Sequence, residues 1–172
     1  MCVADLPLFL RWRGRPTLAS PEFEQLVGVA DRLVVDSREW SDARAMYPRL
    51  EPYLERIAIS DIVWSRTLPW RKAIAGLWPE VRRAERLRVT GPRPEALLLA
   101  GWLRSRLGRK VQLLHRDATT LSSVQVDELT VPKPPRDGRD ASDLLSDQLD
   151  QFGRDRIYEA ALLASAETPK RR

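Results

Sequence analysis

Cysteine and histidine are almost absent from this 172-residue chain, which contains one of each. The single cysteine, Cys2, cannot form an internal disulfide, and two such residues are too few for a zinc site made from cysteine and histidine. A catalytic triad would have to be built around the only histidine, His115, and no nucleophile motif accompanies it. We therefore interpret His115 as an ordinary histidine at the end of a strand.

Three kinds of sequence segment are also missing. No apolar run approaches the roughly 18 to 20 residues that a membrane helix needs, and the N-terminus does not have the pattern of a secretory signal. The glycine-rich loops with which dinucleotide-binding and P-loop enzymes hold phosphate do not occur. The sequence thus predicts a cytoplasmic binding protein rather than an enzyme, with no catalytic residues, no bound cofactor, no metal and no membrane partner.

Positive charge is plentiful but dispersed. The chain has a net charge of +5 and 29 basic residues, all but four of them arginine, interleaved with 24 acidic residues. Nucleic-acid-binding surfaces more often show clustered basic residues with glycine or exposed aromatic residues. An arginine-rich nucleic-acid-binding α/β module is therefore kept only as an alternative.

Alternating apolar runs and helical patterns predict an α/β fold. Residues 6–12 and 33–35 are expected to be buried strands on either side of a helix that begins at Ser20. Residues 86–90 and 111–114 flank a second helix over 94–107, in which Gly101 suggests close backbone packing. Two such βαβ-type units predict a mostly parallel sheet with flanking helices.

The remaining segments complete the predicted organisation. Two short helices are expected over 41–57 and an antiparallel edge strand over 123–131. The α/β domain would span 1–131, followed by a proline-rich linker over 132–140. A C-terminal helical pair over 141–166 would pack on the domain, and 167–172 would be a disordered tail.

A tryptophan-rich helix is predicted over 60–79, between the two units. Ser60 would be its N-cap, and Pro69, which lacks an N–H, would kink it. Its wide apolar stripe is typical of a helix pressed into a core. Alternatively, part of its tryptophan and arginine surface binds a partner protein, and the pattern does not separate the two possibilities.

Five blocks of the sequence resemble, in the same order, the OpcA-type glucose-6-phosphate dehydrogenase assembly proteins. They are residues 5–12, 31–37, 60–71, 99–103 and 155–162. The resemblance implies a non-catalytic allosteric activator that promotes the active oligomer of glucose-6-phosphate dehydrogenase in the oxidative pentose phosphate pathway. Family members carry a further region ahead of the first block, so this chain is expected to correspond to their C-terminal part.

The physics of interfaces selects the candidate partner-binding residues, because tryptophan, tyrosine and arginine are the usual anchors. We expect these to be Trp64, Arg66, Trp70, Arg71 and Tyr158. For each of them, packing in the core is left open as the alternative. A third functional possibility is a sugar-phosphate-binding sensor that uses the loops near Asp36 and Thr90, since α/β folds bind ligands at the carboxyl ends of their strands.

Overall fold

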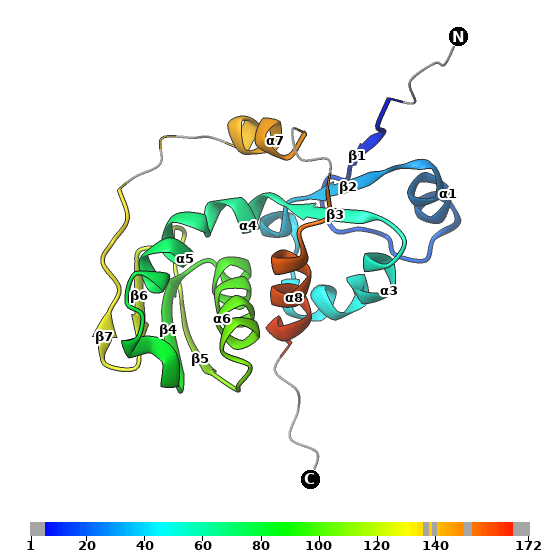
Figure 1. The fold of residues 1–172 in the computed structure, drawn as a ribbon. Helices are drawn as coiled ribbons and strands as arrows, with labels where there is room; N and C mark the ends of the chain where they lie inside the picture. Colours follow the sequence, from blue (N-terminus) through cyan, green and yellow to red (C-terminus); the bar gives the residue numbers. More distant parts are fainter. Residues whose placement is uncertain (1–5, 136–137, 139–140, 150–152, 167–172) are drawn as a thin grey trace.

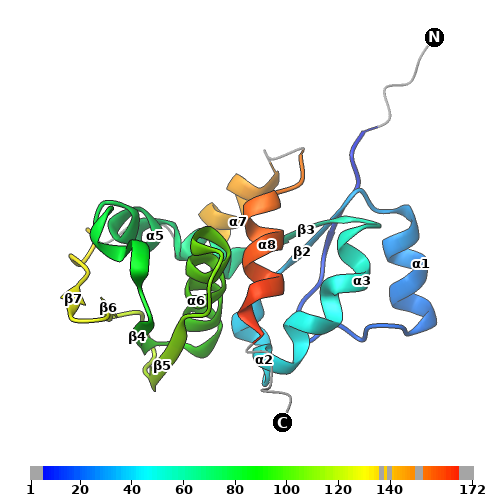
Figure 2. The same ribbon diagram turned by 60° about the horizontal axis from the view of Figure 1, so that its bottom comes forward.

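Two small β-sheets lie on either side of a central pair of helices, α6 (Arg93–Leu107) and α8 (Arg156–Ser165) (Figure 1). The structure is a computed structural model, and it describes residues 6–135, 138, 141–149 and 153–166. Figure 2 shows the same arrangement from a second direction, with α6 and α8 side by side. The α/β class predicted from the sequence is confirmed.

Sheet A contains β1 (Phe9–Arg11), β2 (Arg32–Val35) and β3 (Ala58–Asp61), all parallel and in that order. The connecting helix α1 (Pro21–Val29) begins where the Ser20 hydroxyl accepts a hydrogen bond from the Phe23 N–H. The first predicted βαβ unit is therefore present. The prediction that its first strand is buried is wrong, because β1 lies at the edge of the sheet and Leu6 just before it is 87% exposed.

Sheet B contains β4 (Arg86–Gly91), β5 (Gln112–Asp117), β6 (Ser123–Val126) and β7 (Leu129–Thr130), in the order β5-β4-β6-β7. β4 and β5 are parallel, and α6 connects them, which confirms the second unit. β6 and β7 add antiparallel strands, as the weak alternation over 123–131 predicts. The two units form separate sheets, however, rather than one mostly parallel sheet.

Short helical segments follow strands β2 and β3. After strand β2 they are η1 (Ser37–Glu39), α2 (Ala43–Met46), η2 (Tyr47–Leu50) and α3 (Glu51–Leu54). After β3 they are α4 (Ile62–Arg66), α5 (Leu68–Ala75) and η3 (Glu80–Arg83). The first group returns the chain to β3 of sheet A, and the second carries it from the carboxyl edge of sheet A to the start of sheet B.

The tryptophan-rich helix predicted over 60–79 is two helices, and its first residues are a strand. Ser60 belongs to β3, and the N-cap is Asp61, whose carboxylate accepts from the Val63 N–H at 2.9 Å. The break comes at Thr67, where the Thr67 hydroxyl donates to the Trp64 carbonyl. Pro69 at the start of α5 has no N–H to continue the α4 hydrogen bonds, which is the physical reason for the break.

The two C-terminal helices are present, but they pack on different elements. α7 (Ala141–Leu149) lies against α4, and its Leu144 is buried with Val34 and Ile62. α8 lies against α6. The predicted tail over 167–172 and Cys2 lie outside the described residues, and the division into domain, linker and C-terminal segment stays a prediction.

Helix α6 belongs to both apolar cores. Leu97 and Leu98 pack in the core of sheet A, whereas Leu99 and Leu103 pack in the core of sheet B. A Cβ on Gly101 would overlap the carbonyl oxygen of Ala161, which confirms the close approach predicted there and places it against α8. Among the described residues, no helix is long and apolar enough to cross a membrane.

Candidate functional site

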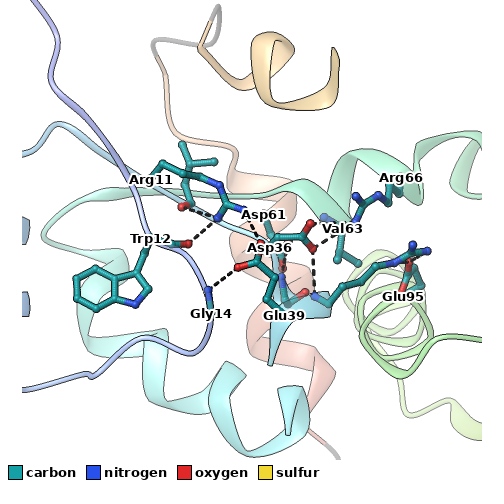
Figure 3. A network of polar contacts seen from close by, with 12 residues as sticks. Arg11, Trp12, Gly14, Asp36, Glu39, Asp61, Val63, Arg66 and Glu95 are labelled. Carbon is teal, nitrogen blue, oxygen red and sulfur yellow. Dashed lines mark hydrogen bonds and ion pairs between the residues drawn. The ribbon is translucent and has the colours of Figure 1, made fainter. Parts of the chain in front are cut away.

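A network of charged and polar side chains occupies the carboxyl edge of sheet A (Figure 3). Asp36 follows β2 and Asp61 ends β3, so the parallel pairing of these strands brings the two carboxylates to one edge. The Asp36 carboxylate accepts from the Arg38 N–H at 3.1 Å. The Asp61 carboxylate accepts one hydrogen bond from the Ser37 N–H, at 3.1 Å, and another from the Val63 N–H. Both carboxylates therefore hold the turns that follow their own strands.

Two ion pairs connect this edge to the rest of the molecule. Arg66 of α4 lies 3.2 Å from each oxygen of Asp36. Arg38 pairs with Glu95, which is buried in the first turn of α6. Since α6 leads into sheet B, the second pair joins the carboxyl edge of sheet A to the other half of the protein.

Asp61 has the most perturbed carboxyl of the network. Burial raises the pKa of its carboxyl to about 7, although the hydrogen bonds from Ser37 and Val63 act in the opposite direction. Its second oxygen, Oδ2, has no hydrogen-bond partner among the described residues. Burial is also the main cause that raises the pKa values of Tyr47 and Tyr158, and the charge of Asp61 adds to it. Asp61 therefore exchanges its proton near neutral pH rather than well below it.

The chemistry available in this network is limited. The Ser37 hydroxyl is fully buried and hydrogen-bonded to that of Tyr47 at 2.8 Å, so a substrate has no route to it. The described residues contain no group of three or more histidine, cysteine, aspartate or glutamate side chains able to hold a metal ion. What the network does is fix the turns after β2 and β3 and connect them to α6.

Three of the five predicted partner-binding residues form one cluster with Asp155, the N-cap of α8. The Trp64 indole N–H donates to the Asp155 carboxylate at 2.7 Å, and the Trp64 ring lies 5.7 Å from that of Tyr158. The guanidinium of Arg71 lies 3.3 Å from the centre of the Trp64 ring and donates to the Trp64 carbonyl. Burial lowers the pKa of Arg71 to about 10. This cluster ties α8 to α4 and α5.

The other two predicted residues lie elsewhere. Trp70 is 6% exposed in the core of sheet B, and Arg66 is held by Asp36. Such burial favours the core-packing alternative for these side chains, while their role in binding a partner stays a prediction. Trp78 is different, because 57% of its surface is exposed. The sequence pattern placed it beside the same apolar stripe and gave no sign of this difference.

The second candidate site is the face of sheet B that points away from α6. Alternation along β4 directs Leu87 and Val89 into the core and Arg88 and Thr90 to the opposite face. The strand register extends this face in two rows. The rows are Leu114–Arg88–Gln125 and Arg116–Thr90–Ser123.

These six side chains are exposed or half-buried, and they line an open hollow of about 420 Å³. The Arg88 guanidinium donates a long hydrogen bond of 3.4 Å to the carbonyl of Asp127. Arg116 has no hydrogen-bond or ion-pair partner in the part of the chain that the structure describes. The face is therefore basic and accessible, and the alternation over 86–90 was the sequence signal from which it could have been found.

His115 is not available for chemistry beside this hollow. One ring nitrogen lies 2.8 Å from the Gly91 carbonyl oxygen, and the other lies 3.0 Å from an Arg93 guanidinium nitrogen. These contacts fit a neutral ring that donates to Gly91 and accepts from Arg93. They agree with the interpretation of His115 as a structural residue at a strand.

Fold and sites together define an α/β protein in which two small sheets share a central helix pair. Residues 57–162 match the family described as the C-terminal domain of the glucose-6-phosphate dehydrogenase subunit, and the chain belongs to that family. The matched region runs from the start of β3 into α8 and so includes sheet B and both central helices.

Curated relatives support the same assignment. The chain is 30% identical over 117 residues to the protein OpcA of Nostoc punctiforme, covering 62% of this chain and 25% of that protein. It is 29% identical over 118 residues to OpcA of Synechococcus elongatus, covering 63% of this chain and 26% of that one. Both are provisionally assigned to the OxPP cycle. The resemblance seen in the sequence blocks is thus confirmed, and the chain spans about a quarter of the length of these relatives.

Proposed function

We propose that the chain acts with glucose-6-phosphate dehydrogenase, as a non-catalytic partner that promotes the active oligomer of that enzyme in the oxidative pentose phosphate pathway. The observation that carries this proposal is the family match over residues 57–162. The relatives named OpcA support the same pathway. The place of action would be the cytoplasm, and no cofactor would be required.

The polar groups of the described residues support a binding role. The most perturbed of the buried carboxyls, that of Asp61, lies in a network whose serine and tyrosine hydroxyls are buried and bonded to each other. The only histidine has both ring nitrogens engaged. A partner without chemistry of its own can still change turnover, because a protein that binds the active oligomer more tightly than the dissociated enzyme shifts the population toward that oligomer.

A titration of dehydrogenase activity tests the proposal. Increasing amounts of the chain are added to the glucose-6-phosphate dehydrogenase of the same organism, and the mixture is passed over a size-exclusion column. We expect turnover to rise to a plateau and the chain to elute with the larger form of the enzyme. Unchanged turnover together with separate elution of a folded chain would contradict it.

The nucleic-acid alternative is weakened by the open face of sheet B. Sheet faces that bind single-stranded RNA stack bases on aromatic side chains. None of the six side chains in the two rows is aromatic. A gel-shift assay with RNA over a range of salt concentrations distinguishes this alternative, since phosphate contacts weaken steeply with salt.

The sugar-phosphate alternative has one observation in its favour. The Asp36 loop is already held by Arg66, but the hollow beside Thr90 contains two arginines. Thermal-shift measurements with glucose 6-phosphate, 6-phosphogluconate and NADP test it directly. A shift that Arg116→Glu removes would place the ligand in the hollow.

A further inference from the structure

The open face of sheet B combines two arginines with small polar side chains. We propose that this face is the docking surface for an acidic segment of the partner dehydrogenase. The proposal rests on the proposed function and adds to it the surface and the chemistry of contact. Three observations support it: the charge of the face, the spacing of its arginines and its shape.

The charge of the face is unbalanced. Among the described residues that line the hollow there are two arginines and no aspartate or glutamate. About half of the other arginines whose contacts are described pair with carboxylates, as Arg38, Arg66 and Arg86 do. Arg116 instead is exposed and has no partner in the part of the chain that the structure describes. A carboxylate from outside the chain would give Arg116 the kind of partner that Arg38, Arg66 and Arg86 have within it.

The spacing of the arginines suits an extended segment. Arg88 lies in the first cross-strand row, and Arg116 lies in the second row on the neighbouring strand. Standard sheet geometry puts their Cα atoms about 8 Å apart, while alternate residues of an extended chain lie about 7 Å apart. Two acidic residues at alternate positions can therefore meet both guanidinium groups. Leu114 lies next to Arg88 across the strands and offers apolar contact between them.

The shape of the face favours a protein segment over a small molecule. The hollow extends over β4, β5 and β6, and three of the six side chains in the two rows are exposed. Small-molecule sites enclose most of their ligand, which an open sheet face does not do. Thr90, Ser123 and Gln125 can exchange hydrogen bonds with the main chain of a bound segment. None of the six side chains in the two rows has an aromatic ring on which a base could stack.

Charge reversal at the face tests the proposal, with a matched control. The affinity of the full chain for the dehydrogenase is measured by titration calorimetry for the wild type, Arg116→Glu, Arg116→Lys and Arg13→Glu. Arg13 is exposed, lies between β1 and α1, and also has no described hydrogen-bond or ion-pair partner. Arg13→Glu changes the net charge by the same amount as Arg116→Glu, but outside the open face of sheet B. Circular dichroism melts confirm that each variant is folded.

We expect Arg116→Glu to weaken binding at least about tenfold, since it places like charges together at the contact. Arg116→Lys and Arg13→Glu should stay within about threefold of the wild type. The wild-type affinity should fall as sodium chloride is raised, whereas the residual affinity of Arg116→Glu should change less.

The two proposals fail in different ways. If the wild type binds the dehydrogenase and Arg116→Glu binds equally well, the docking surface is wrong while the proposed function stands. If Arg13→Glu weakens binding as much as Arg116→Glu does, net charge rather than this face governs the contact, and the docking surface is again wrong. If the folded wild type binds RNA or a sugar phosphate through Arg116 and does not bind the dehydrogenase, both proposals are overturned.

Discussion

At the scale of the residue, two tryptophans that are close in sequence have opposite surroundings. Trp70 is 6% exposed in the core of sheet B, whereas Trp78 is largely in solvent. We predict that Trp70→Ala lowers the free energy of unfolding by about 3–5 kcal/mol, because it leaves a large cavity. Trp78→Ala should change it by less than about 0.5 kcal/mol. Urea denaturation of both variants measures the difference, and equal losses would contradict the assignment of Trp70 to the core.

The carboxyl of Asp61 predicts a pH dependence. Its pKa is about 7 in the folded protein and its ordinary value is 3.8, so the folded state holds the proton more tightly than the unfolded chain. The contribution of this group to stability therefore falls as the pH rises from about 4 to about 7 and stays at its lowest above that range. Relative to Asp61→Asn, which does not titrate, the wild type should lose up to about 4 kcal/mol between these limits.

Urea denaturation of the wild type and of Asp61→Asn at pH 4.5 and pH 8 tests this prediction. Taking the difference between the two proteins at each pH removes the titration of the shared groups that do not interact with Asp61. A difference that is the same at both pH values would show that Asp61 titrates normally in the folded protein.

The local role of these residues is easier to predict from the sequence than their burial or exposure in the fold. Asp61 could be recognised as an acidic residue at a helix start, and in the structure it caps α4 in place of the predicted Ser60. Its full burial depends on the pairing of β3 with β2 and on Tyr47 from a different segment. Likewise, the exposure of Arg116 follows from the register of three strands, which no local pattern fixes.

At the scale of the element, the contact between α6 and α8 depends on the absence of a side chain at Gly101. A Cβ there would overlap the Ala161 carbonyl oxygen and lie 2.8 Å from the Ser165 nitrogen, both of which are backbone atoms of α8. Backbone atoms cannot move aside as the end of a long side chain can. We predict that Gly101→Ala lowers the free energy of unfolding by roughly 2–3 kcal/mol or more, because of this overpacking.

Gly28→Ala is the matched control, because Gly28 is also in a helix and nothing lies within 4 Å of its added Cβ. It should leave stability unchanged or raise it by up to about 1 kcal/mol, through the better helix propensity of alanine. Thermal melts compare the stability of the two variants with that of the wild type. A Gly101→Ala variant as stable as Gly28→Ala would mean that the helices are not in close contact.

Prediction of the elements succeeded where periodicity was long and failed where it was short. The fifteen-residue helix α6 has a strong apolar pattern and was predicted to within one residue at its start. The four-residue strand β3 was missed, because Ala58 to Asp61 follow a helical stretch and give no alternation of their own. Its pairing with β2, a tertiary contact, makes it a strand.

At the scale of the whole molecule, the two sheets depend on a shared helix. α6 supplies Leu97 and Leu98 to one core and Leu99 and Leu103 to the other. We predict a single cooperative unfolding transition, because neither core can lose α6 and remain packed. Tryptophan fluorescence, far-ultraviolet circular dichroism and calorimetry should give one common midpoint. Two separated transitions would show that the cores unfold independently.

Sequence patterns could not predict whether the strands form one sheet or two. Each βαβ-type unit was predicted from its own strands and helix, and both are present. Whether two units share hydrogen bonds or stand apart depends on the segment between them. Here the break at Thr67 and the short helices around it carry the chain from one sheet to the other, and that geometry depends on contacts far apart in the sequence, such as those of Trp64 with Asp155 and of Arg66 with Asp36.

The position of β3 also constrains how shorter forms of this protein can be made. A gene fragment limited to the family match at 57–162 would begin at β3 and discard β1, α1 and β2. The hydrogen-bonding edge of β3 would then be bare, and Ile59 would lose its cover by Phe23 and Leu33 of the same core. Bare strand edges pair with those of other molecules. Expression of the fragment would therefore yield self-associated material unless the N-terminal strands were kept.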